Sequence, residues 1–88
     1  MSEESQVYKA TVVVTLRKSI LDPQGKAVEH ALHSLGADRI SDIRMGKRIE
    51  FILQVDKKEE AEIMTIDACK KLLANPVMED FSYELEKV

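Results

Sequence analysis

The stretch LDPQGKAVEHALHSLG, residues 21–36, contains the signals that begin and end a helix. Asp22 is a favourable N-cap, and Pro23 suits the first helical position because its φ is fixed and it has no amide proton. Gly36 suits the left-handed residue that follows the last turn. Apolar residues recur at helical spacing between these signals: Ala27, Val28, Ala31, Leu32 and Leu35. The stretch therefore predicts a capped helix with one apolar stripe.

Strand patterns lie on both sides of this helix. Upstream, VYKATVVVTL at residues 7–16 is rich in β-branched residues and alternates, which is typical of a strand. Downstream, residues 39–56 predict a hairpin with a two-residue loop at Gly46-Lys47, because a leading glycine suits the type II′ turn. Asp42 and Arg44 interrupt the first strand of that hairpin, residues 39–45, and make it polar enough for a sheet edge.

The last third of the chain predicts one more helix and one more strand. Asp56 followed by Glu59 resembles a capping box, and the acidic first turn suits the positive end of the helix dipole. The helix is expected to run to about Ala74, where Asn75-Pro76 ends it. Residues 80–88 then alternate apolar and polar side chains and predict a strand that is charged on one side.

The order of these elements favours an α+β fold, the ferredoxin-like β-α-β-β-α-β sandwich, with a four-stranded antiparallel sheet and two helices on one face. The apolar strands 7–16 and 48–56 are expected at the centre, and the charged strands 39–45 and 80–88 at the edges. The opposite face is left open and partly apolar, which predicts association with another chain. Its residues are Lys9, Thr11, Val13, Thr15, Glu50, Ile52, Gln54 and Glu84.

Length and charge exclude several classes of protein. With 88 residues we expect a single domain at 7–88 after a flexible extension at 1–6, and no deep catalytic cavity. The formal net charge of -3 argues against nucleic-acid and anionic-membrane partners, since phosphate binding needs concentrated Lys and Arg. No apolar run approaches the roughly 20 residues that span a bilayer, and the N-terminus does not resemble a signal sequence, so a cytoplasmic location is expected.

Few residues indicate chemistry. Cys69 is predicted to be a small buried hydrophobe, since no neighbouring base or cation marks it as activated. His30 and His33 are predicted to flank the helix core, with a weak metal site or a pH-sensitive contact as the alternative. No catalytic constellation is present in the sequence. Gly25 in a first helical turn indicates either close approach by a partner backbone or simple tolerance near the helix end.

Four segments carry a resemblance to a known family: VVVTLRKSILDP, SILDPQGKAVEHALHSLG, DIRMGKRIEF and CKKLLANPVMEDFSYELE. Together they cover almost everything after residue 6. On these segments the chain resembles PurS, the small subunit of bacterial phosphoribosylformylglycinamidine (FGAM) synthase. The resemblance is specific, because the segments are long and free of gaps and helix capping alone does not require them.

This resemblance implies a non-catalytic subunit that joins a PurL-like synthetase to a PurQ-like glutaminase in purine biosynthesis and supports ammonia transfer between them. It implies a homodimer or a dimer of dimers, no activity of the chain on its own and no cofactor bound by it, while the complex uses ATP, Mg and glutamine. Because binding residues tend to lie at loop ends of a rigid scaffold, partner contacts are expected at seven residues. These are Asp22, Pro23, Gln24, Gly25, Arg44, Gly46 and Lys47.

Other classes of protein fit the sequence less well. The main alternative is a stand-alone dimeric regulatory module of ferredoxin-like fold that binds a small molecule, such as an amino acid, between paired subunits. An RNA-binding sheet is less well supported, because the central strands lack exposed aromatic residues on which bases stack. A metallochaperone of similar topology would need a paired-cysteine loop, and the chain has one cysteine.

Overall fold

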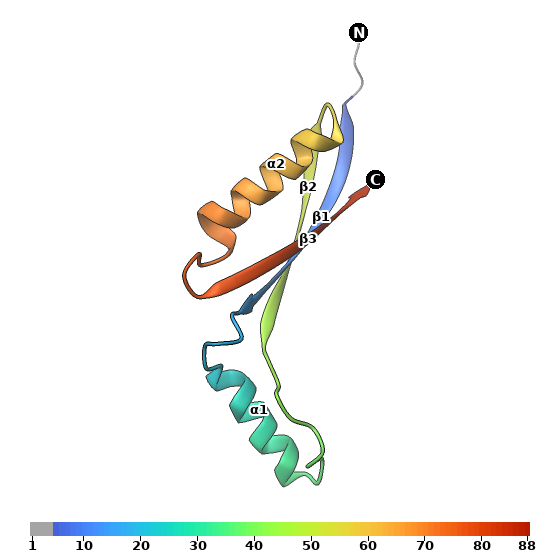
Figure 1. Cartoon of the computed structure of the whole chain (residues 1–88). Coiled ribbons are helices and arrows are strands. Elements are labelled where there is room, and N and C mark those ends of the chain that lie inside the picture. Colours follow the sequence, from blue (N-terminus) through green and yellow to red (C-terminus); the bar gives the residue numbers. More distant parts are fainter. Residues whose placement is uncertain (1–4) are drawn as a thin grey trace.

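The structure is a computed structural model that describes residues 5–88, so the extension expected at 1–6 lies mostly outside it. Three strands and two helices follow one another along the chain, and a π-helical turn, η1, extends the second helix (Figure 1). Their bounds are β1 Gln6–Leu16, α1 Pro23–Ser34, β2 Gly46–Val55, α2 Lys58–Ala68, η1 Cys69–Leu73 and β3 Glu79–Lys87.

The sheet has three strands in the order β2-β1-β3, and both pairings are antiparallel. In its register Val12 of β1 lies between Ile49 of β2 and Tyr83 of β3. The predicted central place of residues 7–16 and the edge place of the last strand are confirmed. The central place predicted for residues 48–56 is wrong, since β2 is the other edge of this sheet.

The predicted four-stranded sheet is wrong because residues 39–45 form no strand. Asp42 has a φ of 62°, which turns the chain out of the extended conformation, and the Met45 amide donates to a side chain rather than to a strand. The predicted hairpin loop is wrong for the same reason. Gly46 is the first residue of β2 and pairs with Thr15, where an added Cβ would lie 2.6 Å from the Val14 carbonyl oxygen.

The core lies between α2 and one face of the sheet. Its buried apolar side chains alternate along β1 and β2 as the sequence predicts, and α2 and η1 supply small residues that allow the helix to approach closely. They are Tyr8, Ala10, Val12, Val14, Leu53, Val55, Ala61, Cys69 and Ala74. The predicted burial of Cys69 is confirmed, since its side chain has no exposed surface.

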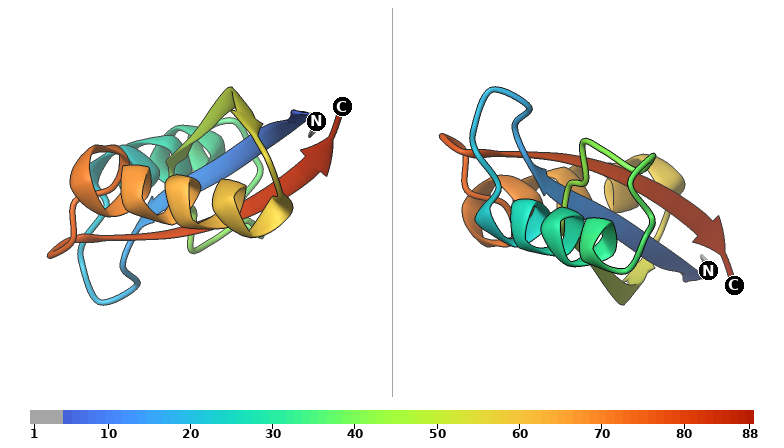
Figure 2. Two further views of the ribbon diagram at one scale, coloured as in Figure 1. Left: turned by 90° about the horizontal axis from the view of Figure 1, so that it is seen from above. Right: turned by 90° about the horizontal axis from the view of Figure 1, so that it is seen from below.

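The first helix does not cover the sheet, contrary to prediction. α1 lies beyond the end of the sheet, and α2 lies at the other end of the molecule (Figure 1). Viewed along the long axis, α2 is nearer from above and α1 is nearer from below (Figure 2). The molecule is consequently elongated, with extents of 62 × 26 × 14 Å. The apolar stripe predicted for α1 exists but points to solvent, as the 82% exposure of Leu35 shows.

Helix ends follow the local signals with one exception. Asp22 caps α1 through the Gly25 amide, and Gly36 takes the predicted left-handed conformation with a φ of 95°. The capping box predicted at Asp56 and Glu59 is wrong, because α2 begins at Lys58 and Glu60 accepts the Asp56 amide proton instead. Asn75 ends the second helix as predicted, and its side chain accepts from the amides of the next turn.

The face of the sheet opposite α2 is open, as predicted. Val13 and Ile52 on this face are 40% and 61% exposed, and Glu50 pairs there with Lys9 and with Arg48. Among the described residues, neither helix has the length and apolar character needed to cross a bilayer.

Candidate partner-contact site

The junction between the sheet and α1 gathers the residues that the sequence predicts to contact partners. The chain leaves β1 through residues 17–22 and returns to β2 through residues 35–45. Four of the predicted residues, Asp22, Gln24, Gly46 and Lys47, line one cavity of about 260 Å³ beside the ends of β1 and β3. Residues far apart in the sequence thus form one patch.

Asp22 is held by backbone donors from both sides of the junction. Its Oδ1 accepts the Gly25 amide proton at 2.9 Å, and its Oδ2 accepts the Met45 amide proton at 2.7 Å. Only 3% of Asp22 is exposed. The hydrogen bond from Gly25, then that from Met45, lowers the pKa of this carboxyl against the opposing effect of burial, and the Arg44 charge lowers it further. The side chain is a carboxylate whose two oxygens are occupied, which leaves it poorly suited to act as a general base.

Arg44 and Gly25 also make contacts within the chain. Arg44 Nη2 donates to the carbonyl oxygens of Arg17 at 2.8 Å and Ile20 at 2.7 Å. Gly25 is buried, and an added Cβ would lie 2.1 Å from the Ile43 carbonyl oxygen. A backbone does approach Gly25 closely, but it belongs to this chain and not to a partner, as one interpretation of the sequence had it.

Three of the predicted residues present exposed side chains at the junction: Pro23, Gln24 and Lys47. None of them makes a side-chain hydrogen bond or ion pair within residues 5–88. Their polar groups and apolar ring are therefore available to another molecule, whereas Asp22, Gly25 and Arg44 already serve the fold.

The two histidines of α1 are exposed rather than packed at a core. His33 Nε2 lies 2.6 Å from the Ile40 carbonyl oxygen, a contact that ties the end of α1 to the following loop. The His30 carbonyl oxygen accepts from the Ser34 hydroxyl. Within the described part of the chain, no three His, Cys, Asp or Glu side chains lie close enough to share a metal ion.

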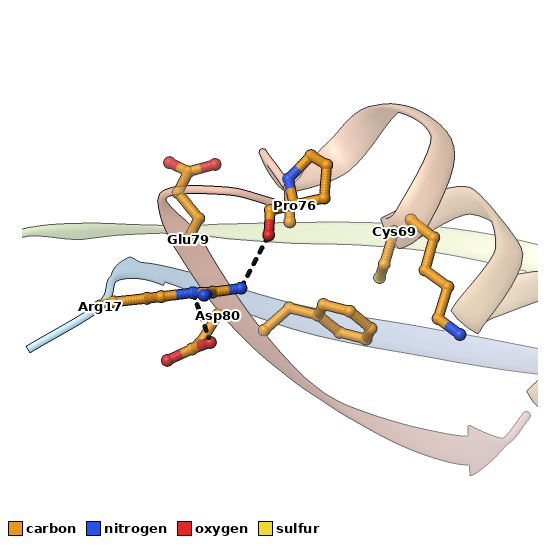
Figure 3. A pocket seen from close by; sticks show the side chains of 8 residues that line it. Arg17, Cys69, Pro76, Glu79 and Asp80 are labelled. Atoms are coloured by element: carbon orange, nitrogen blue, oxygen red, sulfur yellow. Dashed lines mark hydrogen bonds and ion pairs between the residues drawn. The ribbon is translucent and has the colours of Figure 1, made fainter.

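A second cavity, with a volume of about 500 Å³, lies elsewhere, between η1 and the start of β3 (Figure 3). Arg17 reaches across it to Asp80 Oδ1 at 3.4 Å and to the Pro76 carbonyl oxygen at 2.7 Å. Cys69 lines its inner wall, and burial raises the pKa of that thiol, so the neutral form is favoured. Sequence reasoning did not single out Arg17, since its partners lie about 60 residues away and no local motif marks it.

These observations define a class of protein: a small elongated α+β chain that uses its polar side chains to support an exposed helix. The sequence profile described as "PurS: Phosphoribosylformylglycinamidine (FGAM) synthase" matches residues 9–87. The chain belongs to the PurS family. The phosphoribosylformylglycinamidine synthase subunit PurS of Bacillus subtilis is 44% identical over 82 residues, which cover 93% of this chain and 96% of that protein. The subunit of the same name from Methanocaldococcus jannaschii is 37% identical over 82 residues, 93% of this chain and 99% of that one.

Solved structures of the family share the fold described above. PurS of Methanocaldococcus jannaschii, described as one of the subunits of formylglycinamide ribonucleotide amidotransferase in the purine biosynthetic pathway, aligns with a TM-score of 0.82 at 36% identity. That alignment covers 92% of this chain and 98% of the other. A chain in the structure of PurLQS from Thermotoga maritima aligns with a TM-score of 0.80 at 30% identity, covering 93% of this chain and 98% of that one.

Proposed function

We propose that this chain is a non-catalytic bridging subunit of FGAM synthase, which joins a PurL-like synthetase subunit to a PurQ-like glutaminase subunit. Membership of the PurS family supports this proposal, and so does the likeness to a chain of the Thermotoga maritima PurLQS structure. Within such a complex the chain would contribute surface and shape to the ATP- and glutamine-dependent reaction.

The exposed helix α1 is the observation that supports a role in assembly, because its apolar stripe needs another chain to cover it. An isolated helix of 12 residues is marginal in water and is normally stabilised by packing of an apolar face. Here α1 makes no extensive contact with another helix or strand of the described chain, and Val28 and Leu35 are 38% and 82% exposed. An apolar stripe held out in this way is suited to cover a surface on another protein.

The chemistry at the junction supports a structural role over a catalytic one. Both oxygens of the Asp22 carboxylate are occupied by backbone donors, and in η1, away from the junction, burial raises the pKa of the Cys69 thiol and so disfavours the reactive thiolate. Ammonia that escapes from a glutaminase into water is diluted and protonated, so transfer benefits from a fixed geometry and a path that excludes solvent. A rigid subunit placed between two enzymes supplies the first of these needs.

We further propose that two copies of the chain associate through α1. The apolar face of the sheet beside α2 carries large side chains that are only partly buried, which are Ile49, Phe51, Phe81 and Tyr83. In the four-stranded ferredoxin-like sandwich that the sequence predicts, the chain's own first helix would cover these four side chains. Because α1 lies beyond the sheet, a second copy's α1 is the element of matching chemistry that could take that place.

For the contacts with the larger subunits we propose Pro23, Gln24 and Lys47, which are exposed around the junction cavity, together with the edge of that cavity at Gly46. Asp22, Gly25 and Arg44 act in this proposal through the conformation that they impose on the same patch.

Sedimentation of the three separately purified chains tests this assignment. The wild-type chain is expected to bring PurL-like and PurQ-like subunits into one complex, whereas Gln24→Ala with Lys47→Glu is expected to weaken that complex at least about tenfold without changing the thermal unfolding of the small chain. Lys58→Glu, which changes an exposed lysine on α2, is the matched control. Assembly of the two large subunits that is equally tight with and without the small chain would contradict the bridging proposal.

A further inference from the structure

Packing against the sheet or against α2 does not fix the direction in which α1 projects. The apolar stripe of the helix is exposed, and no strand or second helix of the described chain supports it along its length. Two chain segments without regular structure, residues 17–22 and 35–45, connect α1 to the sheet. Two such connections alone would allow the helix to swing.

Hydrogen bonds fasten these two connections to each other at the sheet end of α1. The Asp22 carboxylate accepts from Gly25 at the start of the helix and from Met45 on the returning segment, at 2.9 and 2.7 Å. Arg44 on the returning segment donates to the carbonyl oxygens of Arg17 and Ile20 on the outgoing segment, at 2.8 and 2.7 Å. Each segment therefore contributes one side chain that bonds to the backbone of the other segment.

Steric contact completes this arrangement. The first turn of α1 lies so close to the returning segment that the Ile43 carbonyl oxygen occupies the space of a Cβ at residue 25. Only glycine allows this approach. We call the set of Asp22, Gly25, Ile43, Arg44 and Met45 the clasp.

We propose that the clasp, rather than packing of α1, fixes the direction of this helix relative to the sheet and so presents its apolar stripe in one orientation. Asp22 and Arg44 are positioning residues in this device. The helix reaches its binding partner already ordered, which reduces the entropy that association must offset. The inference concerns the free chain and holds whatever surface α1 binds.

Distance measurement between spin labels tests the proposal. Labels are attached at His30→Cys on α1 and Gln54→Cys on β2, both exposed residues, while Cys69 is buried and protected from labelling. All labelled chains carry Leu35→Glu, which opposes packing of α1 on a second copy because Leu35 is 82% exposed, and they are diluted tenfold with unlabelled chain of the same sequence so that pairs within one copy dominate. The clasp is loosened with Asp22→Ala and Arg44→Ala, and Lys26→Gln is the control on α1 outside the clasp.

A narrow distance distribution is expected for the unaltered clasp and for Lys26→Gln, and a width at least twice as large for Asp22→Ala and Arg44→Ala. Asp22→Asn and Arg44→Lys, which retain part of the hydrogen bonding, are expected to give intermediate widths and replace the alanine variants where these do not fold. A width that stays narrow in folded variants would show that contacts of α1 fix its direction, and it would overturn the proposal.

Discussion

The Asp22 carboxylate accepts a hydrogen bond of 2.7 Å from the backbone amide of Met45, which lies 23 residues further along the chain. The same carboxylate caps α1 through Gly25. One side chain therefore both begins the helix and ties the helix to the strand that follows it. Because Met45 immediately precedes β2, this bond also determines where the second strand can start.

Gly25→Ala tests the close approach within the clasp. Alanine is favoured over glycine in a helix by about 1 kcal/mol, so a first turn free of contacts would be stabilised by this change. Here the new Cβ would lie 2.1 Å from the Ile43 carbonyl oxygen. We expect the free energy of unfolding, measured with urea, to fall by about 1–3 kcal/mol. Gln24→Ala at the exposed neighbouring residue is the control, and a stabilised Gly25→Ala variant would refute the contact.

Acid titration tests the role of the Asp22 charge. Hydrogen bonds from Gly25 and Met45 lower the pKa of this carboxyl in the folded chain, so between that lowered pKa and the ordinary value of 3.8 the unfolded state binds more protons. The stabilisation is complete above 3.8 and is lost as the pH falls through the lowered pKa. We expect wild type to exceed Asp22→Asn in stability at pH 6, and the difference to shrink below pH 4. A difference that does not change with pH would exclude the charge as its cause.

Self-association tests the exposed stripe of α1. Burial of a leucine side chain contributes about 1.5–3 kcal/mol, so Leu35→Glu should raise the dissociation constant of self-association by roughly tenfold or more. The thermal midpoint of the dilute chain should stay close to that of wild type, because Leu35 is already 82% exposed. Ile63→Glu, at a 68% exposed residue of α2, is the matched control. Equal dissociation constants for all three chains would remove α1 from the interface.

Cys69 provides a test of the core beneath α2. Its side chain has no exposed surface and burial raises the pKa of its thiol, both of which oppose reaction with a thiol reagent. We expect labelling of the native chain to be at least about 100-fold slower than labelling in urea, which corresponds to an opening free energy of about 3 kcal/mol. Similar rates in both conditions would mean that η1 opens freely.

The parts of the fold that sequence reasoning predicted are those governed by near neighbours. Asp22, Pro23, Gly36 and Asn75 act on the backbone within a few residues, so their patterns locate the helix ends correctly. The alternation along β1 likewise reports directly on its two faces. These signals hold whatever the rest of the chain does.

The parts that it missed depend on contacts between distant segments. Asp42 and Arg44 between apolar residues resemble an edge strand, yet Arg44 is used to hold the carbonyl oxygens of Arg17 and Ile20. The stripe of α1 resembles the core-facing side of a sandwich helix, and no local pattern reveals that the helix is held away from its own sheet. The predicted sandwich is therefore wrong in two respects: residues 39–45 add no fourth strand, and α1 does not cover the sheet.

Reconstitution of the glutamine-dependent reaction is the most direct test of the bridging role. The PurL-like and PurQ-like chains are assayed with and without this chain, with either glutamine or ammonia as the nitrogen source. If the chain holds the two enzymes together, its omission should abolish turnover with glutamine and leave turnover with ammonia largely unchanged. Glutamine-dependent turnover that persists in its absence, or turnover by the small chain alone, would contradict the account.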